Sequence, residues 1–240
     1  MTEGHASTSP PRPTGVRTTK RRGRTSTAQI QALAALGEVW QVGADDVTTA
    51  RRRAAAFGRT GPLLVDLGVG DGRATIDWAV RRPDADVVAI ELHRPGIVKL
   101  LRALDATGPA NVRVIEDDAL AVLDAVEPGS VRAVRVLFPD PWPKRRHVAR
   151  RLVDRRFVTH MAEILEPGGV LHLATDWADY AQHMASMVAT EPRFVRDEAA
   201  GRPARPITAY EQRGLDARRT IVDLVFHLDG SRPSGPTDRG

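Results

Sequence analysis

An aspartate and a tryptophan are fixed among three prolines in the segment Phe138-Pro139-Asp140-Pro141-Trp142-Pro143-Lys144. The segment follows an apolar run, 131–138, that is typical of a buried strand. In open α/β sheets, ligands bind outside the carboxyl ends of the strands, and proline restricts the backbone there. The sequence therefore predicts a rigid site at this strand end, in which Asp140 is a candidate acid or base.

A cationic run continues from the prolines as Lys144-Arg145-Arg146-His147-Val148-Ala149-Arg150-Arg151. Between residues 144 and 156 there are seven Lys or Arg and one acid, Asp154. Cations beside an aromatic side chain suit a polyanion that carries flat bases, although a charge run can also be a solvated helix face. We expect phosphate contacts from Arg145, Arg146, Arg150 and Arg151.

A glycine-rich loop, Asp66-Leu67-Gly68-Val69-Gly70-Asp71-Gly72, follows the first apolar run, 63–67. Its glycines permit a tight turn and close approach of a ligand to the backbone. A dinucleotide fingerprint needs its third glycine five positions after the first, where this chain has Arg73. Asp66 and Asp71 would also repel a pyrophosphate. The loop therefore disfavours NAD and ATP and favours a neutral or cationic cofactor.

Acidic residues also end the next two predicted strands, Glu91 after 87–90 and Asp118 after 112–115. An acid at the position of Glu91 can accept hydrogen bonds from both hydroxyls of a ribose. Together with Asp66, these acids suit a nucleoside that bears an amino group and a positive sulfonium, as S-adenosylmethionine does. The alternative for Asp118 is that it caps the following helix.

Six apolar runs are predicted as strands, with helical patterns between the first five: 63–67, 87–90, 112–115, 131–138, 170–174 and 221–228. This alternation is typical of a parallel sheet covered on both faces. Apolar residues at Ile30, Leu33, Leu36 and Trp40 predict an amphipathic helix that leads into the domain.

Composition narrows the functional class of the 240-residue chain, of which 42% is hydrophobic. There is no cysteine, which excludes a disulfide framework, a thiolate nucleophile and a cysteine zinc site. The seven histidines are scattered, so we expect no metal. No apolar run has the length of a signal peptide or a membrane span, and we expect a cytoplasmic protein without a membrane partner.

The formal charge of +5 lies in the amino-terminal segment, since residues 1–26 hold six Lys or Arg and one Glu. We expect a disordered basic arm over 1–25, a single domain over 26–228 and a flexible tail over 229–240. Arg21, Arg22 and Arg24 of the arm are further candidates for phosphate contacts.

Three motifs in order resemble the bacterial tRNA (guanine-N7-)-methyltransferase family: the 138–144 segment, His172-Leu173-Ala174-Thr175-Asp176-Trp177, and Arg205-Pro206-Ile207-Thr208-Ala209-Tyr210-Glu211-Gln212-Arg213-Gly214. The resemblance covers about residues 20–228. It implies an α/β, Rossmann-like class I methyltransferase fold, with a mostly parallel seven-stranded sheet flanked by helices. The family usually has Glu where Asp66 stands and an aromatic residue where Val69 stands.

The resemblance also implies roles for individual residues. Methyl transfer from S-adenosylmethionine to guanine N7 at tRNA position 46, in the variable loop, is the implied activity. Cofactor contacts fall on Asp66, Glu91, Asp118 and Asp140, beside the loop glycines Gly68, Gly70 and Gly72, and Asp140 is also the proposed catalytic residue. Substrate contacts fall on Lys144, Asp176, Thr208, Ala209, Tyr210 and Glu211. Thr208 and Glu211 can alternatively form a helix capping box.

Guanine N7 has a lone pair and no proton, so its methylation needs positioning and charge stabilisation rather than a general base. Asp140 or Asp176 could stabilise the charge, and either could instead accept hydrogen bonds from guanine N1-H and N2-H. Trp142 could stack on the base or pack on its own loop, and we favour packing. Two other functions stay open: methylation of an exocyclic amine of an RNA base, and RNA binding without catalysis. A monomer or a homodimer fits the sequence equally.

Overall fold

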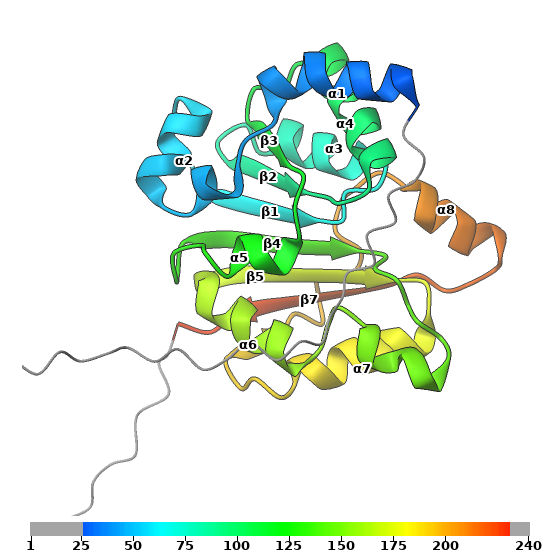
Figure 1. The fold of residues 1–240 in the computed structure, drawn as a ribbon. Helices are drawn as coiled ribbons and strands as arrows, with labels where there is room; N and C mark the ends of the chain where they lie inside the picture. Colours follow the sequence, from blue (N-terminus) through cyan, green and yellow to red (C-terminus); the bar gives the residue numbers. More distant parts are fainter. Residues whose placement is uncertain (1–25, 231–240) are drawn as a thin grey trace, which may run out of the picture.

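A seven-stranded sheet with helices on both faces forms the centre of the computed structural model, which describes residues 26–230 (Figure 1). The strands are β1 (Leu63–Leu67), β2 (Asp86–Ile90), β3 (Val112–Ile115), β4 (Val131–Leu137), β5 (Leu165–Thr175), β6 (Phe194–Arg196) and β7 (Val222–Leu228). Their order is β3-β2-β1-β4-β5-β7-β6, and β7 runs antiparallel to both of its neighbours while the other pairs are parallel. The predicted fold class is thus confirmed.

The helices are α1 (Thr27–Trp40), α2 (Ala50–Phe57), α3 (Arg73–Arg81), α4 (Arg94–Thr107), α5 (Ala119–Leu123), α6 (Arg155–Ile164), α7 (Ala178–Val188) and α8 (Ala209–Asp216), with 3-10 turns η1 (Ala44–Val47) and η2 (Arg145–Arg150). Helices α1, α3 and α4 lie on one side of the sheet, and α6 and α7 lie on the other (Figure 1). Helix α8 stands apart from both layers, at the end of the sheet to which the arrows of β4 and β5 point.

Alternating strand residues build a separate core on each face of the sheet. On β1, Leu64 packs in one cluster with Leu100 and Leu101 of α4. Its neighbour Val65 packs in the other cluster, which includes Phe157 of α6. Because β1 is buried on both faces, its five residues read as one continuous apolar run interrupted only by Asp66.

Three details differ from the sequence-based expectations. Ile30 is exposed although Leu33, Leu36 and Trp40 of the same helix pack on the core, so the buried stripe of α1 is shorter than predicted. Strand β5 begins at Leu165, which pairs with Val131 ahead of a register shift, rather than at 170. Strand β6 was not predicted, because only Phe194 of its three residues is buried and no alternation can show.

The predicted basic arm, with Arg21, Arg22 and Arg24, lies outside the described residues, as do residues 231–240 of the tail. Within 26–230, no helix is both long and apolar enough to cross a membrane. The same residues contain no group of three or more side chains placed to hold a metal ion. The domain limits at 26 and 228 stay a prediction.

Candidate active site

The glycine loop joins β1 to α3, and its three glycines all adopt positive φ: 74° at Gly68, 60° at Gly70 and 80° at Gly72. This backbone region is accessible to glycine at little cost. A Cβ atom built on Gly68 would meet nothing within 4 Å, so the loop opens onto free space there. A Cβ atom on Gly70 would instead lie 3.2 Å from the ring of Tyr210 in α8. The loop therefore offers one open backbone position next to one that an aromatic ring covers.

Glu91, at the end of β2, joins this strand end to the glycine loop. Its Oε1 accepts hydrogen bonds from the backbone N–H groups of Leu92 and His93, both at 2.8 Å. Its Oε2 accepts from the N–H of Gly70 at 3.4 Å. Asp118 caps α5, since its Oδ1 accepts from the N–H groups of Leu120 and Ala121. The capping alternative for Asp118 is thus confirmed, and both acids lie at the carboxyl edge as predicted.

Asp66 lies below the loop rather than at its surface. Its Oδ2 accepts hydrogen bonds from Thr75 Oγ1 and Arg135 Nη2, each at 2.7 Å, and its Oδ1 accepts from Arg135 Nε at 3.2 Å. The side chains of Arg135 and Asp66 are only 4% and 3% exposed, and the Arg135 guanidinium lies 4.2 Å from the centroid of the Trp78 ring. Asp66 therefore ties β1 to β4. A direct cofactor contact from Asp66 stays a prediction that would require these bonds to be exchanged.

The proline segment after β4 holds Asp140 between two strained residues. Phe138 and Trp142 have φ of 54° and 42°, in the left-handed region that side-chain-bearing residues rarely adopt. The Phe138 N–H donates to Ala174 O of β5 at 2.8 Å, which anchors the start of the loop. Asp140 is exposed, and it forms no hydrogen bond or ion pair within residues 26–230. Such strain clusters at functional sites, and here it accompanies an Asp140 carboxylate that has no partner among residues 26–230.

Trp142 contacts its own loop, in agreement with the packing that we favoured. The Arg150 guanidinium lies 5.0 Å from the centroid of its ring, and the His147 ring meets it edge-on at 5.7 Å. Desolvation, followed by the charges of Arg150 and its neighbours, lowers the pKa of His147. The positive charge of this segment therefore comes from its Lys and Arg residues.

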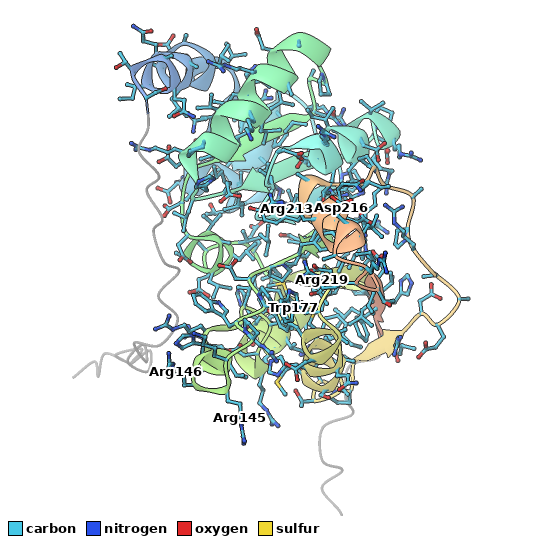
Figure 2. The ribbon with its side chains drawn as sticks, turned by 90° about the vertical axis from the view of Figure 1, so that its right-hand side faces the viewer. Arg145, Arg146, Trp177, Arg213, Asp216 and Arg219 are labelled. Carbon is cyan, nitrogen blue, oxygen red and sulfur yellow. The ribbon has the colours of Figure 1, made fainter. Side chains whose placement is uncertain are left out.

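Arg151 does not belong to the predicted phosphate surface. Its side chain is 4% exposed, it pairs with Asp179, and its Nε donates to Pro141 O at 3.0 Å. It thus supports the loop from below. In contrast, Lys144, Arg145, Arg146 and Arg150 are exposed, and Figure 2 shows Arg145 and Arg146 pointing outward below Trp177.

Helix α8 lies over the carboxyl edge of the sheet. Tyr210 and Gly214 are four residues apart and so share one face of the helix. Tyr210 meets Gly70 of the loop after β1, whereas a Cβ atom on Gly214 would lie 2.8 Å from Asp176 Cβ, after β5. One helical face therefore spans from the glycine loop to Asp176, across the end of β4 that carries the Asp140 segment.

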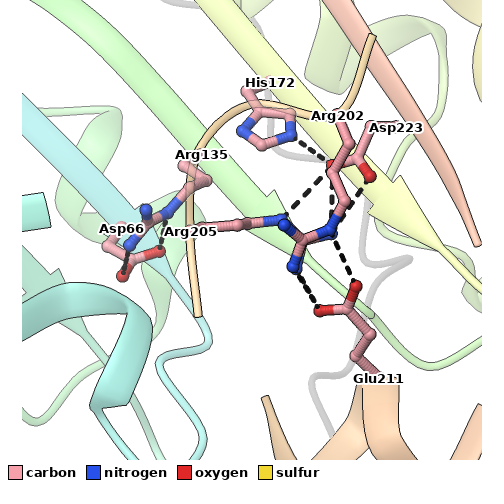
Figure 3. Close-up of polar contacts among 7 residues, drawn as sticks. All are labelled: Asp66, Arg135, His172, Arg202, Arg205, Glu211 and Asp223. Carbon is pink, nitrogen blue, oxygen red and sulfur yellow. Dashed lines mark hydrogen bonds and ion pairs between the residues drawn. The ribbon is translucent and has the colours of Figure 1, made fainter. Parts of the chain in front are cut away.

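The amino-terminal end of α8 is fixed by a cap and by a buried ion network, of which Figure 3 shows the network. Thr208 Oγ1 accepts from the N–H of Glu211 at 3.1 Å, which is half of the predicted capping box. The carboxylate of Glu211 does not complete the box, because it binds Arg202 and Arg205 instead. Thr208 and Glu211 are buried, Ala209 is half-buried and Tyr210 is exposed. Tyr210 is thus the member of the predicted substrate segment that faces the site.

Arg205 is the centre of this network and was not among the predicted residues. It pairs with Glu211 of α8 and, at 3.1 Å, with Asp223 of β7, which also binds His172 Nε2 at 2.7 Å. Its guanidinium lies 5.5 Å from the ring centroid of Phe138. Burial lowers the pKa of His172 despite the opposing effect of Asp223. Arg205 therefore connects α8, β7 and the start of the Asp140 segment.

Asp176 follows β5, the strand beside β4, so it shares an edge with Asp140. Its Oδ2 lies 2.8 Å from Nε of Arg219 in an ion pair.

Arg135 is another residue absent from the predicted set. The sequence does mark it, because Arg135 and Asp66 are the charged residues that interrupt two apolar runs. The strand register places these two residues side by side. Arg205 and Arg219 had no such signal.

The fold and its carboxyl-edge site define a Rossmann-like methyltransferase. The family described as "Putative methyltransferase" matches residues 60–224. A tRNA (guanine-N(7)-)-methyltransferase of Nitrosomonas eutropha is 45% identical over 174 residues, 71% of this chain and 78% of the relative. One of Nocardioides sp. is 42% identical over 219 residues, covering 90% and 88%. The chain belongs to the tRNA (guanine-N(7)-)-methyltransferase family.

Solved structures agree on the fold. The 16S rRNA methyltransferase KamB superposes with a TM-score of 0.54 at 16% identity, covering 76% of this chain and 94% of that one. The aminoglycoside resistance methyltransferase NpmB1 gives a TM-score of 0.52 at 17% identity, with 75% and 94% covered.

Proposed function

We propose that this protein methylates N7 of guanine 46, in the variable loop of tRNA, with S-adenosylmethionine as the methyl donor. One observation carries the proposal: Asp140 and Asp176 follow adjacent parallel strands under a helix that reaches the glycine loop. Two carboxylates thereby lie at one edge beside a cofactor loop. The names of relatives that are more than 40% identical over most of their length support the same activity.

The residues at the edge fit the proposed donor. No atom lies within 4 Å of a Cβ atom built on Gly68, so a ligand can approach the backbone there, and Glu91 places a carboxylate at the end of the second strand. When bound, S-adenosylmethionine supplies a methyl group on a positively charged sulfur. We propose that Glu91, Asp118 and Asp140, with the loop glycines, hold it, and that Tyr210 closes the site from above.

In the proposed reaction, the protein positions the two substrates and stabilises the developing charge, because guanine N7 attacks with its own lone pair. As the N7–C bond forms and the S–C bond breaks, positive charge moves from sulfur to the purine. A fixed carboxylate beside the purine lowers the energy of that transition state. Asp140, which is exposed and unpaired within 26–230, is the residue that we assign to this role.

Phosphates of the tRNA would bind the exposed side chains of Lys144, Arg145, Arg146 and Arg150. We further propose that the basic arm, with Arg21, Arg22 and Arg24, adds to this surface. The protein would act in the cytoplasm, as a monomer or a homodimer, without a metal.

Product chemistry tests the reaction. The purified protein is incubated with labelled methyl donor and unmodified tRNA, and the modified nucleotide is mapped. A tRNA that becomes cleavable at position 46 after borohydride and aniline contains N7-methylguanosine. Methylation without such cleavage would favour an exocyclic amine, and failure to bind S-adenosylmethionine in calorimetry would favour RNA binding without catalysis.

A variant tests the role of Asp140. Asp140→Ala is expected to lower turnover about 100- to 1,000-fold, the usual effect of removing one transition-state stabiliser. The unfolding temperature should stay unchanged, since Asp140 has no partner within 26–230. Asp105→Ala, which removes an exposed aspartate of α4, is the matched control. Turnover near that of the control would refute the assignment.

A further inference from the structure

Arg219 lies in the connection between α8 and β7, and it already occupies the Asp176 side of the site. Its Nε is 2.8 Å from Asp176 Oδ2, and its guanidinium lies 5.3 Å from the centroid of the Trp177 ring. Figure 2 shows Arg219 beside Trp177, between the α8 residue Arg213 and the outward-pointing Arg146. One arginine thus forms an ion pair with a carboxylate and covers an aromatic face at the carboxyl edge, although its buried Nε forms no hydrogen bond within residues 26–230.

A guanidinium and the Watson–Crick edge of guanine share their recognition chemistry. Guanine contains a guanidine unit, whose N1-H and N2-H groups donate from one plane. A carboxylate accepts from either group, and an aromatic ring stacks on either plane. Asp176 and Trp177 therefore offer guanine the two contacts that Arg219 makes now.

We infer that Arg219 occupies the position of the target guanine, paired with Asp176 and over the face of Trp177, until the base enters. The inference rests on the proposed function. Entry of guanine exchanges the Arg219 guanidinium for guanine N1-H and N2-H on Asp176. The released guanidinium then rotates into solvent, since its side chain is 37% exposed.

The local structure allows the side chain to leave while the backbone stays. The N–H of Arg219 donates to Gly214 O at 2.9 Å, so its backbone is tied to the helix that packs on Asp176. The preceding residue, Arg218, has a φ of 55°, which fixes the turn out of α8. The Arg219 side chain is 37% exposed, whereas that of Asp176 is 12% exposed. A half-exposed cation can rotate into solvent, but the carboxylate beneath it is covered while it stays.

Occupation of the guanine position by Arg219 has a measurable consequence. A ligand binds with an affinity reduced by the fraction of molecules whose site is open. Removing Arg219 should therefore strengthen binding of a guanine nucleotide, although the variant loses a positive charge. A phosphate contact or a purely structural role would predict the opposite or no change.

Guanosine monophosphate is the probe, measured as an inhibitor of tRNA methylation. We expect its inhibition constant to fall at least threefold in Arg219→Ala and in Arg219→Gln, which keeps a packing stem on Trp177. Arg81→Ala, which removes an exposed arginine that pairs with Asp77 on α3, should leave the constant unchanged. In Asp176→Asn the constant should rise, and adding Arg219→Ala to that variant should give no further gain.

An unchanged or higher inhibition constant in both Arg219 variants would overturn the inference, as would the absence of inhibition in every protein. Thermal unfolding of each variant shows whether it is folded. The proposed function is judged separately, by methylation of tRNA by the wild-type protein, so that either idea can fail alone.

Discussion

Replacement of Arg205 by alanine should destabilise the protein far more than replacement of Arg202, although both arginines bind Glu211. The Arg205 side chain is 1% exposed and also neutralises Asp223, whereas that of Arg202 is 39% exposed. Removing one partner of a buried ion pair costs about 3 to 5 kcal/mol, because the other charge is left buried without compensation. An exposed pair contributes about 0 to 1 kcal/mol.

Each kcal/mol lowers the unfolding temperature of a domain of this size by about 2 to 4 °C. Arg205→Ala should therefore lower it by about 6 to 20 °C, and Arg202→Ala by no more than about 4 °C. Differential scanning calorimetry at pH 7.5 measures both. Equal shifts in the two variants, or a shift below about 4 °C for Arg205→Ala, would refute the view that burial makes Arg205 the centre of the network.

Three further predictions follow from other contacts. Gly214→Ala should lower turnover about 10- to 100-fold, since its new Cβ would lie 2.8 Å from Asp176 Cβ and misplace the site. The free energy of unfolding should fall as the pH drops below about 6.5, because burial lowers the pKa of His172 and the unfolded chain binds the proton more readily. Arg145→Ala and Arg146→Ala should each reduce the slope of log affinity for tRNA against log salt by about 0.7 to 0.9.

Matched controls separate these effects from general damage. Gln212→Ala changes an exposed position of α8 and should retain turnover. His172→Gln should flatten the loss of stability between pH 7.5 and 5.5, and a wild-type slope in this variant would contradict the role of the histidine. Arg81→Ala lies on α3 and should keep the salt slope, so an equal reduction there would show a nonspecific charge effect.

The parts of the site that follow strands could be predicted from the sequence. Glycines, acids and prolines directly after apolar runs mark the carboxyl edge, and Gly68, Glu91 and Asp140 all lie there. These signals are local, since a strand and the loop after it are neighbours in the chain. Relatives of similar sequence then specify the reaction, which the loop pattern alone cannot.

The position of helix α8 over the site could not be predicted from local sequence patterns. Tyr210 reaches Gly70 across 140 positions of sequence, and only the sheet order brings α8 over the loop after β1. Arg205 is polar, so composition places it at the surface, yet its side chain is almost fully buried. Whether a charged residue is solvated or forms a buried pair depends on its distant partners, here Asp223 and Glu211.

The buried ion network is better explained by the placement of α8 than by stability. Well-packed apolar residues in place of a buried ion network are often neutral or stabilising, so a need for stability alone would not favour Arg205. Apolar contacts are non-directional, whereas a guanidinium has its donors in a fixed fork that orients each carboxylate. Arg205 thereby sets the position of Glu211 on α8 relative to Asp223 on β7 and to the Phe138 ring. Transfer of the methyl group to guanine N7 needs no base, so its rate depends on the alignment of the reacting atoms. A rigidly placed helix α8 over the site is therefore the contribution that this reaction requires.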